Sequence, residues 1–382
     1  MKTLKISFFV FITSVFFLQM IAPQSKKTEN KIFYTYISSA ARDSEAGIIL
    51  FQLDAKQGKL TQIKAFSEFK NSGYLCFSPN QKYLYAIGTT DKNESYVAAY
   101  AINRKTGDLT LLNHIAPIGN NPCYVSVDNS GKYVMTANYS GGDVRVFSLD
   151  KSGRLTGQSD QIQHEGKGIR SQQESAHPHM IISAPKGNMV LVPDLGMDKV
   201  MIYSLDAKTG KLTSAGNQFG AVPQGAGPRH FVFHPKADFA YSINELAGSV
   251  TAYKHALETN RLDSIQTIST LPADFQGENF SADIHISPDG KYLYASNRGP
   301  NTLAVMEINA TSGKLRFKGT FPCGGDWPRA FGIDPSGQFI LVNNQKSNDM
   351  TLFKINLETG FGEPLETIAV KGPLCVKFLE AK

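Results

Sequence analysis

Residues 284–298, IHISPDGKYLYASNR, have the pattern of two short strands joined by a tight turn. β-Branched and aromatic residues fill both halves, and Pro288, Asp289 and Gly290 separate them, as is typical of a β-hairpin. The same pattern recurs in CFSPNQKYLYAIGTT (76–90), VSVDNSGKYVMTANY (125–139), IISAPKGNMVLVPDL (181–195), FVFHPKADFAYSINE (231–245) and FGIDPSGQFILVNNQ (331–345). One repeated unit therefore builds most of the chain.

The period of this repeat is close to fifty residues. The turns are anchored at Pro79, Asn129, Pro185, Pro235, Pro288 and Pro335, at intervals of 50, 56, 50, 53 and 47 residues. Two more strands follow each hairpin, as in KVMIYSLDAKTGKLTS (199–214) and TLAVMEINATSGKLRF (302–317). Four strands per repeat of this length are typical of a β-propeller blade. Two packed sandwiches would also place hairpins in series, but stacked blades explain the even spacing better.

The two ends of the chain supply one further blade. IFYTYIS (32–38), GIILFQLD (47–54) and LTQIKAF (60–66) give three strands without a first strand, and LCVKFLEAK (374–382) gives a first strand with nothing after it. Pairing the ends would close a ring and leave no free sheet edge. The sequence therefore predicts an all-β, seven-bladed propeller over residues 30–382, closed by the N- and C-terminal strands.

The first 22 residues, MKTLKISFFVFITSVFFLQMIA, have two lysines before an uncharged apolar run. This pattern indicates a signal peptide at 1–22 and an exported protein, periplasmic or extracellular. The alternative is a membrane anchor that stays uncleaved, since Pro23 is unfavourable for cleavage after Ala22. Once the signal is removed, no stable membrane partner is expected, because no other segment is long and apolar enough to span a bilayer.

Charge and cysteine content narrow the choice of partners. The net charge of +6 is spread thinly, without a basic block interleaved with aromatics, so no nucleic-acid partner is expected. The four cysteines, Cys76, Cys123, Cys323 and Cys375, are too far apart for a zinc motif. An oxidising compartment would permit disulfides, but buried free thiols are the favoured interpretation. The oligomeric state is left open.

Within the repeat, two positions vary in a way that the scaffold does not require. Six residues before each anchor lie Gly73, Cys123, His179, Arg229, Ala282 and Arg329. Ten residues after it, Glu245, Arg298 and Gln345 replace one another. The start of one hairpin strand and the end of the other are neighbours at the same rim. Arg229 and Glu245 are therefore expected to lie together at one mouth of the central channel.

Nine residues after the anchor, just before the position of Glu245 and its equivalents, five of the six hairpins have Asn or Asp. This is typical of a residue that stabilises a turn. Asn244 and Asn297 nevertheless border the charged position, so they are also candidates for substrate binding.

His179, Arg229, Glu245, Arg298 and Arg329 are predicted to converge at the mouth. His177, His230 and Asp283 lie close to the same position within the repeat. Arginines around one carboxylate and a histidine would form an anion site with an acid/base pair. The same charges could instead form a salt-bridge network between blades. The histidines fall at different phases, so neither a metal site nor a cofactor is expected.

The segments SAHPHMIISAPKGNMVLVPDLGMDKV (175–200), GAGPRHFVFHPKADFAYSINELAGSV (225–250), ADIHISPDGKYLYASNRGPNTLAV (282–305) and DWPRAFGIDPSGQFILVNNQKSNDM (326–350) resemble the seven-bladed propeller lactonases. That family includes bacterial 6-phosphogluconolactonases and, more distantly, a fungal propeller cycloisomerase that makes muconolactone. The resemblance implies a site built from the matching residues, and these are the candidates for catalysis: His179, Arg229, Glu245 and Arg298. Candidates for substrate binding are Arg329, His177, His230, Asn244, Asn297 and Gln345.

The resemblance implies an enzyme that hydrolyses a small-molecule sugar lactone, such as 6-phosphogluconolactone or an unphosphorylated aldonolactone. Either Glu245 or His179 would act as the base, and the arginines would stabilise the oxyanion. The export signal favours an unphosphorylated lactone, because phosphorylated sugars are mostly intracellular. Two other functions remain open: a cycloisomerase acting on a muconate-like dicarboxylate, and an exported propeller that binds a ligand without turnover.

Overall fold

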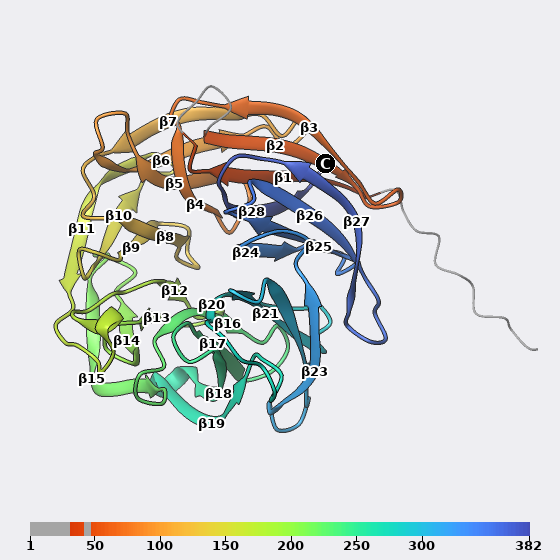
Figure 1. The fold of residues 1–382 in the computed structure, drawn as a ribbon. Helices are drawn as coiled ribbons and strands as arrows, with labels where there is room; N and C mark the ends of the chain where they lie inside the picture. The colour runs from red at the N-terminus through yellow and green to blue at the C-terminus, as the bar shows by residue number, and fades with distance from the viewer. Residues whose placement is uncertain (1–30, 42–46) are drawn as a thin grey trace, which may run out of the picture.

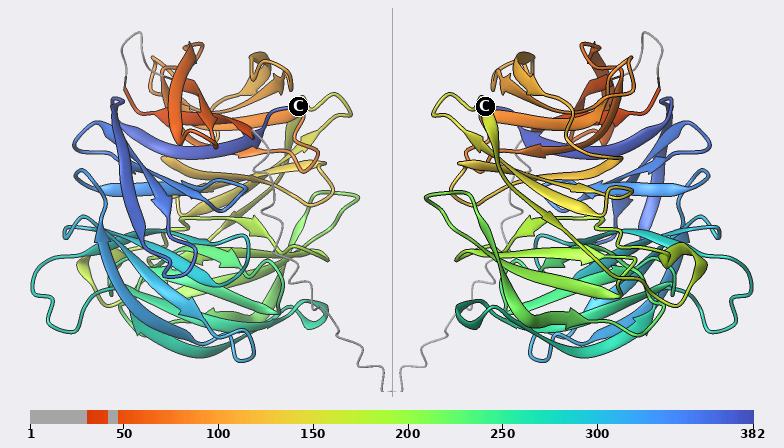
Figure 2. Two further views of the ribbon diagram at one scale, coloured as in Figure 1. Left: turned by 90° about the vertical axis from the view of Figure 1, so that its right-hand side faces the viewer. Right: turned by 90° about the vertical axis from the view of Figure 1, so that its left-hand side faces the viewer.

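The computed structural model describes residues 31–41 and 47–382, so the predicted signal peptide at 1–22 lies outside the described residues. Twenty-eight strands form seven four-stranded antiparallel sheets arranged in a ring (Figure 1). Figure 2 shows the ring edge-on from two sides. The structure is thus the predicted seven-bladed propeller.

The first four blades in chain order begin with the one that the two ends share. Its strands are β28 (Pro373–Glu380), β1 (Ile32–Ser39), β2 (Gly47–Asp54) and β3 (Lys59–Phe66). The next contains β4 (Asn71–Phe77), β5 (Tyr83–Thr89), β6 (Ser95–Ile102) and β7 (Leu109–Ile115). Then follow β8 (Pro122–Val127), β9 (Tyr133–Asn138), β10 (Asp143–Leu149) and β11 (Leu155–Gln163). The fourth has β12 (Ile182–Ser183), β13 (Met189–Asp194), β14 (Lys199–Leu205) and β15 (Leu212–Ala221).

The other three blades have the same order of strands. They are β16 (Pro228–Phe233), β17 (Phe239–Asn244), β18 (Ser249–Ala256) and β19 (Arg261–Ser269); β20 (Phe280–Ile286), β21 (Tyr292–Arg298), β22 (Thr302–Ile308) and β23 (Leu315–Pro322); and β24 (Pro328–Ile333), β25 (Phe339–Asn344), β26 (Asp349–Ile355) and β27 (Gly362–Ala369). Two single-turn 3₁₀ helices, η1 (Ser171–Gln173) and η2 (Leu257–Thr259), lie in connections. The first strand of each blade lies nearest the axis, and in six of the seven junctions it packs against the first strand of the next blade; at the seventh, β13 packs against β16.

The ring is closed as the sequence predicts. β28 pairs with β1 in an antiparallel register that runs from Phe33 opposite Glu380 to Ser38 opposite Cys375. β28 thereby becomes the inner strand of a blade whose other three strands come from the N-terminal part of the chain.

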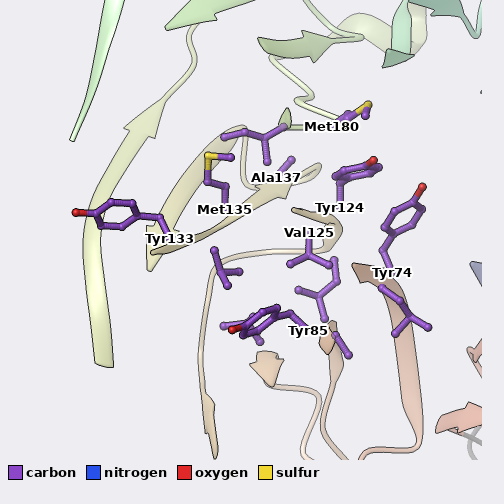
Figure 3. Packing of buried hydrophobic residues seen from close by; sticks show 14 of the residues in the cluster. Tyr74, Tyr85, Tyr124, Val125, Tyr133, Met135, Ala137 and Met180 are labelled. Atoms are coloured by element: carbon purple, nitrogen blue, oxygen red, sulfur yellow. The ribbon is translucent and has the colours of Figure 1, made fainter. Parts of the chain in front are cut away.

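Apolar side chains packed between neighbouring sheets form the core. Figure 3 shows Tyr74, Tyr85, Tyr124 and Met135 in this layer, where Tyr74 and Tyr124 lie with their ring centres 4.2 Å apart. Four tyrosines on second strands also donate a hydrogen bond to a turn glycine of the next blade: Tyr36 to Gly107, Tyr85 to Gly153, Tyr241 to Gly313 and Tyr294 to Gly360, at 2.7–3.0 Å. These glycines have φ between 68° and 83°, which explains their recurrence in the turns between third and fourth strands.

The fourth hairpin departs from the expected pattern. Its first strand, β12, has only two residues, and His179 precedes it instead of opening it. Pro178 forms an isolated bridge with Asp194, and the His179 amide donates to the Pro193 carbonyl at 2.9 Å. Pro178 and Pro193 lack the N–H groups that a continuous ladder needs, so the segment stays close to its neighbour without becoming a full strand.

The four cysteines are free thiols, with Cys323 and Cys375 buried and Cys76 and Cys123 partly so. Across residues 31–41 and 47–382, no helix is long and apolar enough to cross a bilayer.

Candidate active site

A pocket of about 140 Å³ opens at the rim where first strands begin and second strands end. Four of the residues that stand six positions before an anchor line it: Gly73, Cys123, Arg229 and Arg329. Tyr74 and His230, one residue further along their strands, lie beneath them. Because these residues come from four different blades, the ring itself brings them together.

The predicted contact between Arg229 and Glu245 is confirmed. Arg229 Nε lies 2.9 Å from one carboxylate oxygen of Glu245, and Arg298 Nη2 lies 2.9 Å from the other. Only 2 % of the Arg229 side chain and 6 % of that of Arg298 is exposed, against 16 % for Glu245. One carboxylate therefore holds two buried guanidinium groups from adjacent blades, on β16 and β21.

Arg329 adds a third cation to this cluster, without a counterion of its own. No hydrogen bond or ion pair joins its side chain to any of the described residues. Burial, followed by the charges of Arg229 and Arg298, lowers the pKa of Arg329 to about 10. It is still charged at pH 7. Three arginines and one glutamate give the mouth a net charge near +2, which suits an anionic group.

Glu245 is ionised in this setting. Burial alone would raise the pKa of its carboxyl, but Arg298 and Arg229 outweigh that effect, so the pKa lies below its ordinary value. With both oxygens held by guanidinium groups, Glu245 is a weak proton acceptor.

His179 has the opposite character. Burial, and after it the charges of Arg229 and His230, hold the pKa of this imidazole well below its ordinary value, so the ring is neutral at pH 7. Only 5 % of the residue is exposed, and its Nδ1 has no hydrogen-bond partner among the described residues. A buried polar atom without a partner costs free energy unless a bound water or substrate group satisfies it.

His230 is fully engaged by its neighbours. Its Nδ1 lies 2.7 Å from an Asp283 carboxylate oxygen, and Arg229 Nη1 lies 3.2 Å from its Nε2 and 3.5 Å from its Nδ1. The other Asp283 oxygen lies 3.1 Å from Nε2 of His285. Burial, followed by the charge of Arg229, lowers the pKa of His230 to about 4.

Trp327, the only tryptophan of the chain, supports the arginine cluster from outside. The guanidinium carbon of Arg298 lies 5.3 Å from the centre of its ring, and Lys346 Nζ lies 3.2 Å from that centre. The backbone of Trp327 has φ +67°, an uncommon conformation for a bulky residue. Its amide donates to Asn301 Oδ1 at 2.9 Å, which holds this conformation in place.

Of the sequence candidates, Arg229, His230 and Arg329 line the pocket. His179, Glu245 and Arg298 belong to the cluster next to it, and the remaining candidates lie around that cluster. Asn244 and Asn297 are fully buried; Asn244 donates to Ser249 and Thr251, and Asn297 donates to the Thr270 carbonyl. These bonds, within the blade for Asn244 and to the connection between β19 and β20 for Asn297, argue for a structural role and against direct substrate contact.

His177 stacks on Tyr139 with ring centres 4.4 Å apart, and its Nε2 lies 3.4 Å from Glu174. Gln345 is partly buried, and its amide donates to the Trp327 carbonyl at 3.0 Å.

Sequence reasoning placed Asp283 close to the site without giving it a role, and it did not include Tyr74 or Trp327. A signal for the first two was present, because Tyr74, Tyr124, His230 and Asp283 all lie five residues before their anchors. The residues at this position of the repeat line the channel just below the mouth. Trp327 stands two residues before Arg329, in the segment DWPR. In the described part of the chain, no group of three or more His, Cys, Asp or Glu residues is arranged to hold a metal ion.

Comparison with known proteins shows the family of this propeller. The family described as "Lactonase, 7-bladed beta-propeller" matches residues 34–378. A protein of Bacillus subtilis named 6-phosphogluconolactonase is 37 % identical over 345 residues, which are 90 % of this chain and 97 % of that protein. A 6-phosphogluconolactonase of Formosa agariphila is 37 % identical over 320 residues, covering 82 % of this chain and 90 % of the other. The structure of a periplasmic gluconolactonase from Pseudomonas aeruginosa matches with a TM-score of 0.87 and 29 % identity, covering 92 % of this chain and all of that one.

Proposed function

Since the chain belongs to the seven-bladed β-propeller lactonase family, we propose that the arginine-lined mouth is the site where it hydrolyses a sugar lactone. The observation that carries this proposal is the cluster of Arg229, Arg298 and Arg329 around Glu245, next to a neutral histidine. The substrate class is that of the named relatives: 6-phosphogluconolactone or an unphosphorylated aldonolactone.

Two kinds of residue in the pocket lining suit the two parts of such a substrate. Arg229 and Arg329 would attract an anionic group and the polarised carbonyl. Asn71, Thr89 and Asn121 add small uncharged polar groups, which match sugar hydroxyls.

We assign the role of general base to His179. In the proposed reaction, water adds to the lactone carbonyl carbon while the neutral imidazole takes one of its protons. The carbonyl oxygen becomes an oxyanion, which the arginines stabilise. Collapse of this intermediate re-forms the carbonyl and breaks the ring C–O bond, and the imidazolium returns the proton to the departing ring oxygen. The product is the open-chain hydroxy acid.

Glu245 has a different role in this scheme. Because Arg229 and Arg298 hold both of its oxygens, it would fix the two guanidinium groups in place before substrate arrives.

Hydrolysis is tested by following acid release from glucono-δ-lactone and its 6-phosphate, with the spontaneous rate subtracted. We expect His179→Asn, Glu245→Gln and Arg229→Ala each to lower the rate by about a hundredfold or more. Arg316→Gln, which changes an exposed arginine on β23, is the control and should leave the rate unchanged. Wild-type protein that releases acid no faster than buffer would reject both substrates.

We also propose that the protein is exported. The lysines and apolar run within residues 1–22 support this, as does the similarity to a periplasmic gluconolactonase. Cell fractionation, with N-terminal sequencing of the purified protein, tests it. A cleaved chain outside the cytoplasm is expected; an intact chain in the membrane fraction would favour the anchor, and an intact chain in the cytoplasm would reject export.

A further inference from the structure

Tyr139 stands at the mouth without a role in the reaction described above. It follows β9 directly and lies ten residues after the anchor at Asn129, the place that Glu245 and Arg298 occupy in their own blades. Its backbone amide donates at 2.9 Å to the carbonyl of Asn121, a residue that lines the pocket. The third blade therefore brings a phenol to the rim where the fifth and sixth blades bring a carboxylate and a guanidinium group.

Two histidines of the fourth blade fix the direction of this phenol ring. His177 stacks on it with ring centres 4.4 Å apart and an angle of 7° between the ring planes, and its Nδ1 lies 3.0 Å from the Tyr139 carbonyl oxygen. His179, the proposed base, packs against the same ring at an angle of 74°, with the ring centres 5.5 Å apart. A ring held on its face by one imidazole and crossed by another has little freedom to turn away from the mouth.

The hydroxyl of Tyr139 is left free by these contacts. It forms no hydrogen bond with any of the described residues, and it is not among their buried polar atoms that lack a partner, so it is open to solvent. Burial, followed by the charge of Glu245, raises the pKa of Tyr139 to about 12, while the charge of Arg229 acts in the opposite direction. The hydroxyl is therefore protonated at pH 7 and close enough to this ion pair to feel both charges.

The proposed reaction determines what such a hydroxyl would meet. Water held by His179 adds to the lactone carbonyl carbon, and a hydroxyl on a ring that packs against His179 lies near the point of attack. In an aldonolactone, the carbon next to the carbonyl carries a hydroxyl group, which needs a hydrogen-bond partner once it leaves water. Arginine side chains can only donate to that group, whereas a phenol can both donate and accept.

We propose that Tyr139 is a specificity-determining residue: its hydroxyl forms a hydrogen bond with the substrate hydroxyl on the carbon next to the lactone carbonyl. The site thereby favours aldonolactones over lactones that lack this group. The assignment rests on the proposed function, which places the lactone carbonyl at the arginine cluster. A tyrosine that only fills the space beside the two histidines would need its ring but not its hydroxyl.

Removing the hydroxyl alone tests this assignment. Tyr139→Phe keeps the ring that contacts His177 and His179, and it should unfold at the wild-type Tm because the hydroxyl has no partner among the described residues. We compare kcat/KM for glucono-δ-lactone with that for its 2-deoxy analogue, which lacks the hydroxyl next to the carbonyl. Tyr139→Phe should lower the first value about tenfold and the second less than about twofold. Tyr133→Phe, which removes a hydroxyl 3.4 Å from the Ala207 carbonyl oxygen at the other end of β9, is the control and should change neither.

An equal loss of kcat/KM for both lactones in Tyr139→Phe overturns the proposal, and so does no loss for either. A binding measurement separates these outcomes from a failure of the proposed function, because it needs no turnover.

In this measurement, titration calorimetry compares gluconate with 2-deoxygluconate, the hydroxy acids that hydrolysis of the two lactones would release. The wild type should bind gluconate about 5- to 10-fold more tightly than 2-deoxygluconate, and Tyr139→Phe should bind the two acids equally. Wild-type protein that shows this difference but hydrolyses neither lactone would reject the proposed function and support the assignment of Tyr139. Wild-type protein that binds the two acids equally, or binds neither, overturns the assignment.

Discussion

Replacing Arg329 with glutamine should make the protein more stable and less active. Arg329 is a partly buried cation with no ion pair or hydrogen bond to the described residues, and two other arginines lie close to it. Its charge therefore opposes folding, while the proposed function uses the same charge to attract substrate. Functional sites often keep such unfavourable groups because activity requires them.

The size of the effect follows from the pKa of Arg329, which falls from 12.5 to about 10 in the folded protein. For a base, a lower pKa in the folded state means that folding disfavours the charged form. At pH 7 both states are protonated, so the full penalty of about 3 kcal/mol applies. Glutamine removes the charge but loses some packing of the arginine stem, which leaves a gain of about 1–3 kcal/mol.

Thermal unfolding followed by circular dichroism measures this gain. With an unfolding entropy of about 2 cal/mol/K per residue over roughly 350 residues, 1–3 kcal/mol corresponds to a rise in Tm of about 1–4 °C. Arg316→Gln, which removes an exposed ion pair with Glu307, should leave Tm nearly unchanged. A Tm for Arg329→Gln below that of the wild type would refute the reasoning, and unchanged kcat/KM would show that substrate does not use this charge.

Three further predictions concern other parts of the molecule. The pKa of His230 is about 4 in the folded protein and near 6.5 in the unfolded chain, so the unfolded state binds the proton first. The free energy of unfolding therefore decreases as pH falls from 6.5 toward 4. Measured by urea unfolding between pH 7 and 4.5, this decrease should be about 2 kcal/mol smaller in His230→Gln than in the wild type. Trp327→Leu should lower kcat/KM about tenfold by releasing Arg298, whereas Trp327→Phe, which keeps an aromatic face, should lose less; equal losses would argue against the cation–π contact. Deleting residues 373–382 removes β28 and should abolish cooperative unfolding, whereas deleting only Ala381 and Lys382 should lower Tm slightly; circular dichroism and gel filtration distinguish these outcomes.

The blades and the pairing across one hairpin could be predicted from the sequence because both depend on spacing within a repeat. Arg229 and Glu245 are brought together by the two strands of a single hairpin, so counting positions was enough. The same counting placed Arg298 and Arg329 at the mouth, since each occupies an equivalent position in another blade.

Contacts between side chains of different blades could not be predicted from the sequence and are seen only in the structure. Asp283 and His230 meet because β20 and β16 lie side by side at the axis, and their equal phase gives no measure of side-chain direction. The stacking of Trp327 on Arg298 depends on a backbone conformation that the letters DWPR do not specify. Asn244 and Asn297 were candidates for substrate because of their place in the sequence. The Asn244 amide instead donates within its own blade, and the Asn297 amide donates to the connection that follows β19.

The closure of the ring by β28 and β1 has a consequence for how the protein is made. The blade that contains Ile32 cannot be completed until Pro373–Glu380 has left the ribosome, after nearly the whole chain has been synthesised. Throughout that time the backbone groups of β1 that face β28 have no partner, and an unpaired strand edge invites association with other chains. A protein with this topology therefore benefits from being kept apart from its copies, by the ribosome or a chaperone, until Pro373–Glu380 arrives.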